Sequence, residues 1–355
     1  MSSNPSPSNS SRFEGCTLTG ALSVLTEVRD AVCIIHGPAG CTHHNFSLLH
    51  ATILANDRVE VPRLFSTRLA ENDIIFGGEE ALERTITRAL AASPASVFVL
   101  STCIVETIGD DTAAVCAKPW SVPVIAVPTA GFLGGVFATG IRNALSSVAT
   151  LAEPADEVTL TANLIGEKNL EFGVDENAAE LARLLSRLGV GINLRFVRGI
   201  ATEEVSRLGS AAVNILREPA LRPVGEDLKR RLGTPYVDSF PAGLCGTCRF
   251  LEEVGRLCGV DASGAIEEER AFQREMLSRF SDLAGSRVSF RPPHPMLDAD
   301  PAAEAVAAEC AEALCLEVEE DGMVIPVPYP APVGTAGLRR MLNRWRVLVR
   351  GKGRA

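Results

Sequence analysis

Short apolar runs alternate with amphipathic stretches over most of the chain. In the first half, four runs rich in Val, Ile, Leu or Phe have the length of buried strands, and stretches of helical character separate them. Strands that are apolar along their whole length are typical of a parallel sheet covered by helices on both faces. The predicted strands are Ala31–His36, Arg63–Thr67, Ser96–Ser101 and Pro123–Pro128, and the predicted helices include Glu79–Ala92 and Val136–Ala149.

A second alternating run follows Pro154–Asp156, which has the composition of a joint between domains. Its predicted strands are Glu157–Ile165, Gly191–Val197, Ala211–Ile215 and Pro235–Ser239, and its predicted helices are Glu176–Leu188, Pro219–Leu232 and Thr247–Cys258. The remaining pattern is shorter. It comprises predicted helices at Ile266–Leu283, at Pro301–Leu314 and from Gly334 onward, a strand at Arg287–Phe290 and a strand pair within Leu316–Val327.

The predicted fold class is therefore α/β, with two or three doubly wound, Rossmann-like domains built on parallel sheets. The third domain is expected to be truncated, because its segments supply at most half of such a unit. Residues 1–12 are Ser, Asn and Pro with little that could pack, and they are expected to form a disordered lead-in. The expected domain limits are 13–153, 154–258 and 259–355.

Composition narrows the classes of function. The net charge of -10 argues against nucleic acid as the main ligand. No run of 18 apolar residues and no secretory signal pattern occurs, so we expect no membrane span and a cytoplasmic location. In a reducing compartment the ten cysteines are expected to be buried apolar residues, metal ligands or catalytic thiols.

Three cysteines stand out by their surroundings. Cys41 and Cys103 each follow the carboxyl end of a predicted strand, the edge at which open α/β sheets bind ligands. Glycines beside Cys41 leave room for a bulky group, and thiolates are the usual ligands of iron–sulfur clusters. Cys16 lies on a separate segment that can reach the same edge. Spacing alone leaves the alternative open that all three are small buried hydrophobes.

Several motifs resemble the signatures of the nitrogenase component 1 superfamily. They are His36–Cys41, Glu71–Gly78, Thr102–Asp111 and Asn163–Gly166, which follow one another along the chain in the same order as in that family. The resemblance weakens after about Val254. The superfamily includes nitrogenase molybdenum–iron protein subunits and their assembly scaffolds, dark-operative protochlorophyllide reductase and the nickel-sirohydrochlorin reductive cyclase. The resemblance implies that Cys16, Cys41 and Cys103 ligate an iron–sulfur cluster, 4Fe-4S or P-cluster-like, at a subunit interface.

The resemblance also implies a nitrogenase-like oxidoreductase. The chain would form a homodimer, or a heterodimer with a paralogous component 1 subunit, and accept electrons from an ATP-dependent reductase resembling the nitrogenase iron protein. It would reduce a small-molecule substrate, for which a tetrapyrrole is one candidate. The chain has neither a G-x-x-x-x-G-K-[ST] loop nor a G-x-G-x-x-G turn, so ATP is expected only on the partner reductase.

Departures from the family pattern restrict the function. Ala211–Glu218 corresponds to the segment that holds the large metal cofactor of nitrogenase through a cysteine, and it contains no cysteine. The one late histidine, His294, lies in a proline-rich loop that matches nothing in the family. We therefore expect no molybdenum cofactor. Glu106, Asp110 and Asp111 are expected to stabilise helix N-termini.

Histidines near Cys41 are the candidate catalytic groups. His43, His44 and His50 lie on a predicted helix start, and His43 and His50 are two turns apart on one face. They could protonate a substrate or ligate a metal at the cluster rim. The alternative is that they cap the helix or are simply solvated.

Two alternative functions use the same residues differently. A non-catalytic scaffold for metal-cofactor assembly would carry the same cluster. A cysteine-rich redox or zinc protein would instead use the Cys245–Cys248 CxxC pair and Cys258. The remaining cysteines, Cys33, Cys116, Cys310 and Cys315, are expected in the core.

Overall fold

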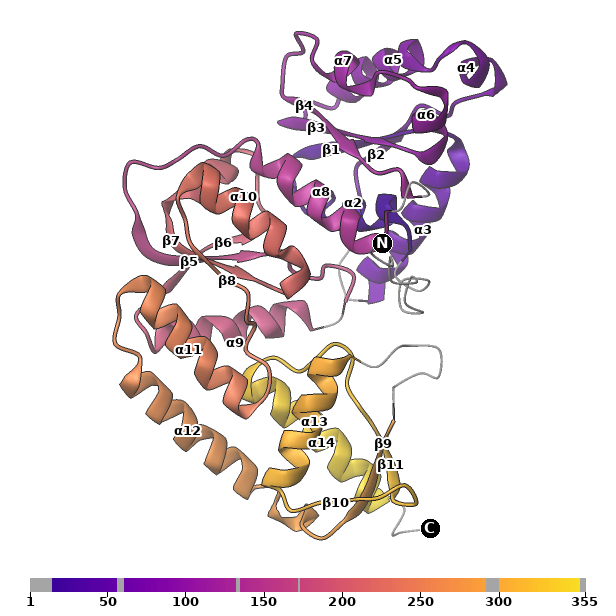
Figure 1. Ribbon diagram of the computed structural model, residues 1–355. Coiled ribbons are helices and arrows are strands. Elements are labelled where there is room, and N and C mark those ends of the chain that lie inside the picture. The colour runs from indigo at the N-terminus through magenta and orange to yellow at the C-terminus, as the bar shows by residue number, and fades with distance from the viewer. Residues whose placement is uncertain (1–14, 56–60, 132–134, 172, 292–299, 352–355) are drawn as a thin grey trace, which may run out of the picture.

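The computed structural model describes residues 15–55, 61–131, 135–171, 173–291 and 300–351. The predicted lead-in and His294 lie outside these ranges. The described strands form three separate sheets in which every paired strand is parallel, and Figure 1 shows them as three successive modules. The predicted α/β class with parallel sheets is confirmed, whereas the domain limits stay predictions.

The first sheet has the strand order β2-β1-β3-β4, and helices cover both of its faces (Figure 1). Its strands are β1 (Ala31–His36), β2 (Leu64–Ser66), β3 (Ser96–Ser101) and β4 (Val124–Pro128). Along β1, Cys33 and Ile35 pack with α2 (Thr17–Leu25) and α8 (Phe137–Ala149). The alternate residues, Val32 and Ile34, pack with α5 (Glu79–Leu90) and α7 (Thr112–Cys116). Ala31–Ile35 are all apolar because successive side chains of the strand enter two different helix layers.

Three further helices of this module leave the carboxyl edge of the first sheet. They are α3 (Ala39–Ala55) after β1, α4 (Glu71–Phe76) after β2 and α6 (Cys103–Ile108) after β3. Each begins within a few residues of the strand before it. This edge is where the candidate site lies.

The second sheet has the order β6-β5-β7-β8 and shares its core with the first. Leu194, Phe196 and Leu216 belong to the same apolar cluster as Leu22 of α2 and Leu145 of α8. The other face packs in a separate cluster. The elements are β5 (Thr159–Ile165), α9 (Val174–Ser186), β6 (Gly191–Phe196), the 3-10 turn η2 (Glu203–Ser210), β7 (Ala211–Leu216), η3 (Pro219–Leu221), α10 (Arg222–Leu232), β8 (Tyr236–Val237) and α11 (Leu244–Cys258).

The third sheet corrects one prediction. The strands β10 (Glu317–Val318) and β11 (Met323–Pro326) both form, but each pairs with β9 (Arg287–Arg291) rather than with the other. The chain crosses β9 at Gly322, where a Cβ atom would lie 2.5 Å from the carbonyl carbon of Val288. The crossing needs glycine, and the local pattern could not distinguish it from a hairpin.

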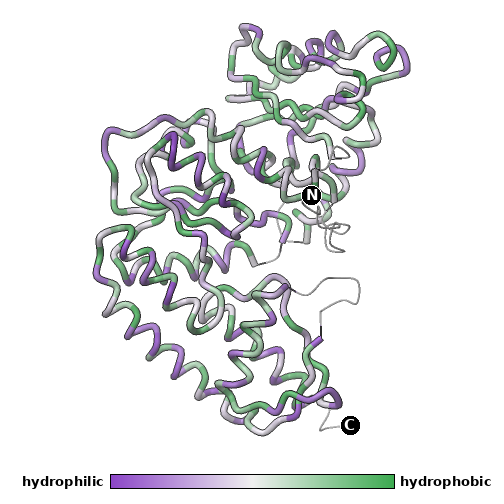
Figure 2. Tube along the Cα trace, viewed as in Figure 1, coloured by the Kyte–Doolittle hydropathy of each residue, from purple (hydrophilic) through white to green (hydrophobic). Residues whose placement is uncertain are grey.

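A second correction concerns the predicted helix Ile266–Leu283. It is α12 (Ser263–Ser278) followed by a separate 3-10 turn, η4 (Ser281–Leu283). Phe280 leaves helical geometry between them and buries its ring. The module is completed by α13 (Pro301–Ala313) and α14 (Gly334–Gly351). Figure 2 shows hydrophobic residues gathered on the strands and hydrophilic residues on the outer helices α10 and α12. Every helix in the described ranges is too short or too polar to cross a membrane.

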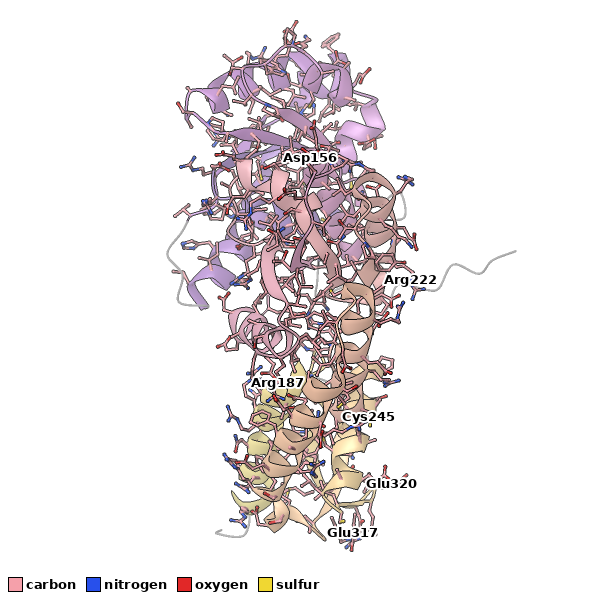
Figure 3. The ribbon with its side chains drawn as sticks, turned by 90° about the vertical axis from the view of Figure 1, so that its left-hand side faces the viewer. Asp156, Arg187, Arg222, Cys245, Glu317 and Glu320 are labelled. Atoms are coloured by element: carbon pink, nitrogen blue, oxygen red, sulfur yellow. The ribbon has the colours of Figure 1, made fainter. Side chains whose placement is uncertain are left out.

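A buried ion-pair cluster joins the second and third modules. Glu269 of α12 is fully buried, and its carboxylate accepts hydrogen bonds from Arg183 at 2.8 and 3.0 Å and from Arg187 at 2.8 Å, both on α9 or directly after it. The hydroxyl of Thr335 on α14 donates to the same carboxylate. Figure 3 labels Arg187 at the level where the two modules meet. One carboxylate therefore holds three helices together.

Replacing Glu269 with Ala is expected to lower the free energy of unfolding by about 3–5 kcal/mol, because it deprives two guanidinium groups of a buried partner. The control is Glu268→Ala, since the Glu268 side chain is 70% exposed and lies 3.8 Å from Arg187. That change is expected to cost less than about 0.5 kcal/mol. Urea unfolding followed by circular dichroism measures both. Equal effects of the two substitutions would contradict the assigned role of Glu269.

Candidate functional site

The structure brings the three predicted cysteines to one edge of the first sheet. Cys16 is the residue before α2, Cys41 lies in the first turn of α3, and Cys103 is the first residue of α6. The adjacent strands β1 and β3 end together, because His36 pairs with Ser101, so the segments that follow them leave side by side. The role of these cysteines as ligands stays a prediction.

The Cys41 thiol is coupled electrostatically to the other two thiols. Burial raises the pKa of the Cys41 thiol, and negative charge on Cys16 and on Cys103 raises it further. Such coupling acts only between groups that are near one another. A cationic metal centre would reverse the effect by favouring all three thiolates together.

Glycines set the position of Cys16. A Cβ atom on Gly20 would lie 2.0 Å from the carbonyl oxygen of Phe137, and one on Gly140 would lie 1.9 Å from that of Thr17. The backbones of α2 and α8 therefore touch, which a larger residue at either position would prevent. Gly131, in the segment after β4, packs against Cys16 itself.

The donor set fits a cluster rather than a single ion. Within the described ranges, no three His, Cys, Asp or Glu side chains converge closely enough to hold one metal ion. Cluster thiolates bind different iron atoms, so they need not meet at a point. A Cβ atom on Gly40, next to Cys41, would have no neighbour within 4 Å, which leaves the open space that a bulky group requires.

A buried histidine–aspartate pair lies under the site. Asp110 stabilises a helix N-terminus, as predicted, because its carboxylate accepts the backbone N–H of Gly78, the residue before α5, at 3.0 Å. The same carboxylate lies 3.1 Å from Nε2 of His36. Burial lowers the pKa of His36, and the charge of Asp110 opposes that shift. Asp111 also acts as predicted, since its side chain accepts the N–H of Ala114 at 2.8 Å.

This pair joins segments that the sequence keeps apart. The N–H of Thr102, next to Cys103, donates to the carbonyl oxygen of His36 at 3.0 Å, and Nδ1 of His36 lies 3.2 Å from the Thr67 hydroxyl. His36 and Asp110 both stand inside the motifs of the resemblance, but only their contact distance reveals the pairing. Glu106 lies in the first turn of α6, as predicted.

The predicted catalytic histidines lie along α3. His43 and His44 are in the turn that follows Cys41, and both are exposed. His50 is half-buried and stacks on Phe46, with ring centroids 5.8 Å apart. Nine residues of helix place it roughly 13 Å along the axis from Cys41. All three stay candidates, and His43 and His44 have the better placement.

The CxxC pair occupies the first turn of α11, and Figure 3 shows Cys245 near the third module. The carboxylate of Glu309 raises the pKa of the exposed Cys245 thiol, and burial raises that of Cys248. Reactive thiols of such pairs have lowered pKa values, so this environment does not favour a redox role. Cys258 is half-buried at the other end of α11.

The cysteines expected in the core require one correction. Cys33, Cys116 and Cys310 are buried as predicted. Cys315 is exposed instead, because it follows α13 with a φ of 54°, a left-handed conformation that turns the chain outward.

The carboxyl edge of the second sheet is filled by charged side chains. The ammonium of Lys168 lies 3.1 Å from a carboxylate oxygen of Glu218 and 3.5 Å from one of Glu171. Beside them, the guanidinium of Arg217 lies 4.5 Å from the centre of the Phe240 ring. Glu218, the last residue of the segment Ala211–Glu218, is thus held in an ion pair.

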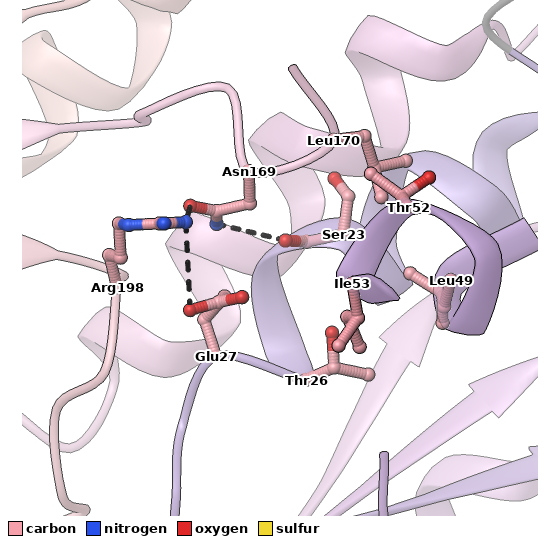
Figure 4. Close-up of a pocket in the computed structure, with 9 residues that line it drawn as sticks. All are labelled: Ser23, Thr26, Glu27, Leu49, Thr52, Ile53, Asn169, Leu170 and Arg198. Atoms are coloured by element: carbon pink, nitrogen blue, oxygen red, sulfur yellow. Dashed lines mark hydrogen bonds and ion pairs between the residues drawn. The ribbon is translucent and has the colours of Figure 1, made fainter. Parts of the chain in front are cut away.

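A polar contact between α2 and the second sheet encloses a small cavity (Figure 4). The side-chain amide of Asn169 donates to the carbonyl oxygen of Ser23 at 2.9 Å, and Arg198 lies between Asn169 and Glu27. The cavity holds about 10 Å³, the size of one water molecule, so it cannot take a substrate. Its polar lining instead fixes the helix behind Cys16 against the second module.

These features define a class: a protein of parallel α/β sheets with converging thiols at the carboxyl edge of its first sheet. The family model described as nitrogenase component 1 type oxidoreductase matches residues 16–290. The chain therefore belongs to this family, which confirms the resemblance found in the sequence motifs.

The relatives that the chain resembles differ in role. The chain is 30% identical over 275 residues to a nitrogenase iron-molybdenum cofactor biosynthesis protein, NifE, of Rippkaea orientalis, covering 74% of this chain and 56% of that protein. It is 28% identical to one of the subunits of light-independent protochlorophyllide reductase from Halorhodospira halophila, covering 78% and 54%. A nitrogenase molybdenum-iron protein alpha chain of Methanothermobacter marburgensis is 26% identical, with 77% and 62% covered. The chain thus spans between half and two thirds of these relatives.

The fold has a counterpart among solved structures. A structure of nitrogenase Cp1 at pH 5 superposes with a TM-score of 0.65 at 22% identity, covering 88% of this chain and 66% of that one. At that identity the likeness establishes the fold.

Proposed function

We propose that this chain is the electron-accepting component of a two-component reductase, with an iron–sulfur cluster on Cys16, Cys41 and Cys103. The supporting observation is the convergence of three thiols at one sheet edge in a chain of this family. The cluster, 4Fe-4S or P-cluster-like, would supply one-electron transfer when bound. The substrate would be a small molecule, reduced with electrons that arrive through this site.

The proposed ligands lie at helix N-termini. Cys16, Cys41 and Cys103 lie at the starts of α2, α3 and α6. The first N–H groups of a helix have no partner within it, and they are oriented to meet negative charge. A negatively charged cluster held by these cysteines would thus lie near three helix starts.

A second subunit would complete the site. Three cysteines leave one iron of a four-iron cubane without a protein ligand, and Cys16 is exposed. A homodimer, or a heterodimer with a paralogous subunit, would supply the remaining ligand across the interface.

An apolar surface at the carboxyl end of α6 is suited to a protein partner. Phe76 is 84% exposed and Ile75 is 70% exposed, both at the end of α4. The hollow next to them is lined by α4, the start of α5 and the end of α6, the helix that begins with Cys103. Acidic residues surround it, namely Glu71, Asp73, Glu79 and Glu80. An apolar centre with a charged rim is typical of interfaces, so we place the ATP-dependent reductase here and expect a basic surface on it.

Metal analysis tests this proposal. Protein purified without oxygen is expected to contain iron and sulfide, to be brown, and to lose its broad visible absorption on addition of dithionite. The iron-loaded form is expected to sediment as a dimer. Molybdenum and vanadium are expected below stoichiometric amounts, because the Lys168–Glu218 ion pair occupies the segment that would need a cofactor ligand. Zinc without iron, or an iron-loaded monomer, would overturn the assignment.

Assembly of a metal cofactor is the second candidate, favoured by the identity to cofactor biosynthesis proteins. A scaffold would carry the same cluster without turning a substrate over. Steady-state electron consumption with the reductase and ATP separates the two, since a scaffold supports none beyond reduction of its own cluster.

A further inference from the structure

Each of the three cysteines has a threonine next to it in the sequence. The hydroxyl oxygen of each threonine is buried, and within the described part of the chain none of the three has a hydrogen-bond partner. The threonines are Thr17 after Cys16, Thr42 after Cys41 and Thr102 before Cys103. A buried hydroxyl without a partner is unfavourable, and protein interiors rarely leave one so.

Local structure would have allowed these hydroxyls other partners. Thr102 is the residue before α6, where a threonine side chain usually accepts a backbone N–H of the helix, yet it makes no such bond. Thr42 lies inside α3, where a hydroxyl can donate to the preceding turn, as that of Thr52 does to Leu48. The hydroxyls of Thr102 and Thr42 use neither of these backbone partners.

Glycines close the space around two of the hydroxyls. A Cβ atom on Gly37 would lie 2.1 Å from Oγ1 of Thr102, and one on Gly135 would lie 2.5 Å from Oγ1 of Thr17. Thr17 and Thr102 are 1% and 2% exposed, so bulk water does not serve them. Gly131 borders both Thr17 and Cys16, since a Cβ atom on it would lie 3.4 Å from Oγ1 of Thr17 and 3.5 Å from Cβ of Cys16.

A hydroxyl next to sulfur already occurs in this site. Oγ1 of Thr19 lies 3.6 Å from Sγ of Cys16, and Thr19 is fully buried. The fold therefore already places one hydroxyl beside a thiol of this site.

We propose that Thr17, Thr42 and Thr102 donate hydrogen bonds to the sulfur atoms of the bound cluster and thereby raise its reduction potential. The inference rests on the proposed function, since it takes the cluster as the missing partner. Hydrogen bonds to sulfur stabilise the reduced form, which carries one more negative charge. One threonine per cysteine distributes this effect over the three ligand segments.

The test is a redox titration of the iron-loaded full chain, followed by electron paramagnetic resonance. Thr17→Val, Thr42→Val and Thr102→Val remove each hydroxyl and keep the branched shape. Each is expected to retain iron and to make one-electron reduction about tenfold less favourable, a shift of about 59 mV. The corresponding Ser variants keep the hydroxyl and are expected to match the parent. Thr112→Val is the matched control, because its buried hydroxyl also has no partner in the described structure, and none of the three proposed ligands is adjacent to it in the sequence.

Stability of the iron-free chain gives a second, independent measurement. Without a cluster the Val variants are expected to melt at or above the parental temperature, because they remove an unpaired buried hydroxyl. A purely structural role predicts the reverse, with lower melting temperature and unchanged potential.

Each remaining outcome decides the inference. The inference would be overturned if all three Val variants kept their full iron content and the parental reduction potential. It would also be overturned if both the Val and the Ser variants lost iron, because the threonines would then matter for packing and not for their hydroxyls. Iron loss in Val alone supports it. Failure of the parent to bind iron is a different result, since that removes the proposed function itself.

Discussion

An anaerobically purified Cys41→Ser variant is expected to lose most of its iron. Cys41 lies in the first turn of α3 and is near enough to Cys16 and Cys103 for negative charge on either to act on its thiol. Loss of a group that merely orients a metal ligand already weakens metal binding by about 10–100-fold, and loss of a ligand itself is expected to cost at least that much. Cys16→Ser and Cys103→Ser are expected to behave alike.

Iron and sulfide analysis, with the visible spectrum, measures this effect. Cys315→Ser is the control, since that thiol is also free and exposed but lies after α13 in the third module. It is expected to retain the full iron content. Full retention in the Cys16, Cys41 and Cys103 variants as well would refute the ligand assignment.

Replacing Phe76 with Asp is expected to slow electron delivery by the reductase about 30-fold or more. Large exposed apolar side chains at the centre of an interface commonly contribute about 2 kcal/mol or more to binding. The added carboxylate would remove that apolar contact, and its desolvation at the centre of the interface would oppose docking. Reduction by dithionite, which needs no docking, is expected to stay at the parental rate.

The measurement compares the rate of cluster reduction by the reductase and MgATP with the rate by dithionite alone. This comparison separates an effect on docking of the reductase from damage to the cluster site. Val347→Asp is the matched control, because Val347 is 69% exposed on α14, in the third module. It is expected to leave both rates unchanged. An equal loss with dithionite would mean that Phe76 supports the site itself and not a partner.

Some of the site was predictable, because its signals are local. The apolar run Ala31–His36 predicted β1 to the residue, since a strand buried on both faces tolerates few polar side chains. The position of Cys41 and Cys103 after two such strands predicted a shared edge. The resemblance grouped Cys16 with them. Its own segment has no strand before it in the described chain, and its position depends on helix contact with α8.

Other features depended on residues far away in the sequence. The helix α11 begins at Leu244 and not at the predicted Thr247, because Glu309 accepts the N–H groups of Leu244 and Cys245 at 2.7 and 2.8 Å. No local sequence pattern predicts a capping side chain that a later helix supplies. The same holds for Asp110, whose partner His36 is 74 residues away.

By itself, then, the sequence determined the strands, the parallel α/β class, the family and the three candidate cysteines. The spacing of apolar residues and the motifs are both properties of residues that are neighbours along the chain. Tertiary structure alone decided that the Asp110 carboxylate pairs with His36, that β10 and β11 flank β9, and that three threonine hydroxyls are left without a partner in the described chain beside the three cysteines. Each of these is a contact between segments distant along the chain or a property of enclosed space. Such properties arise only once the modules pack, since hydrogen bonding and burial depend on which atoms share the interior and not on which residues are adjacent in sequence.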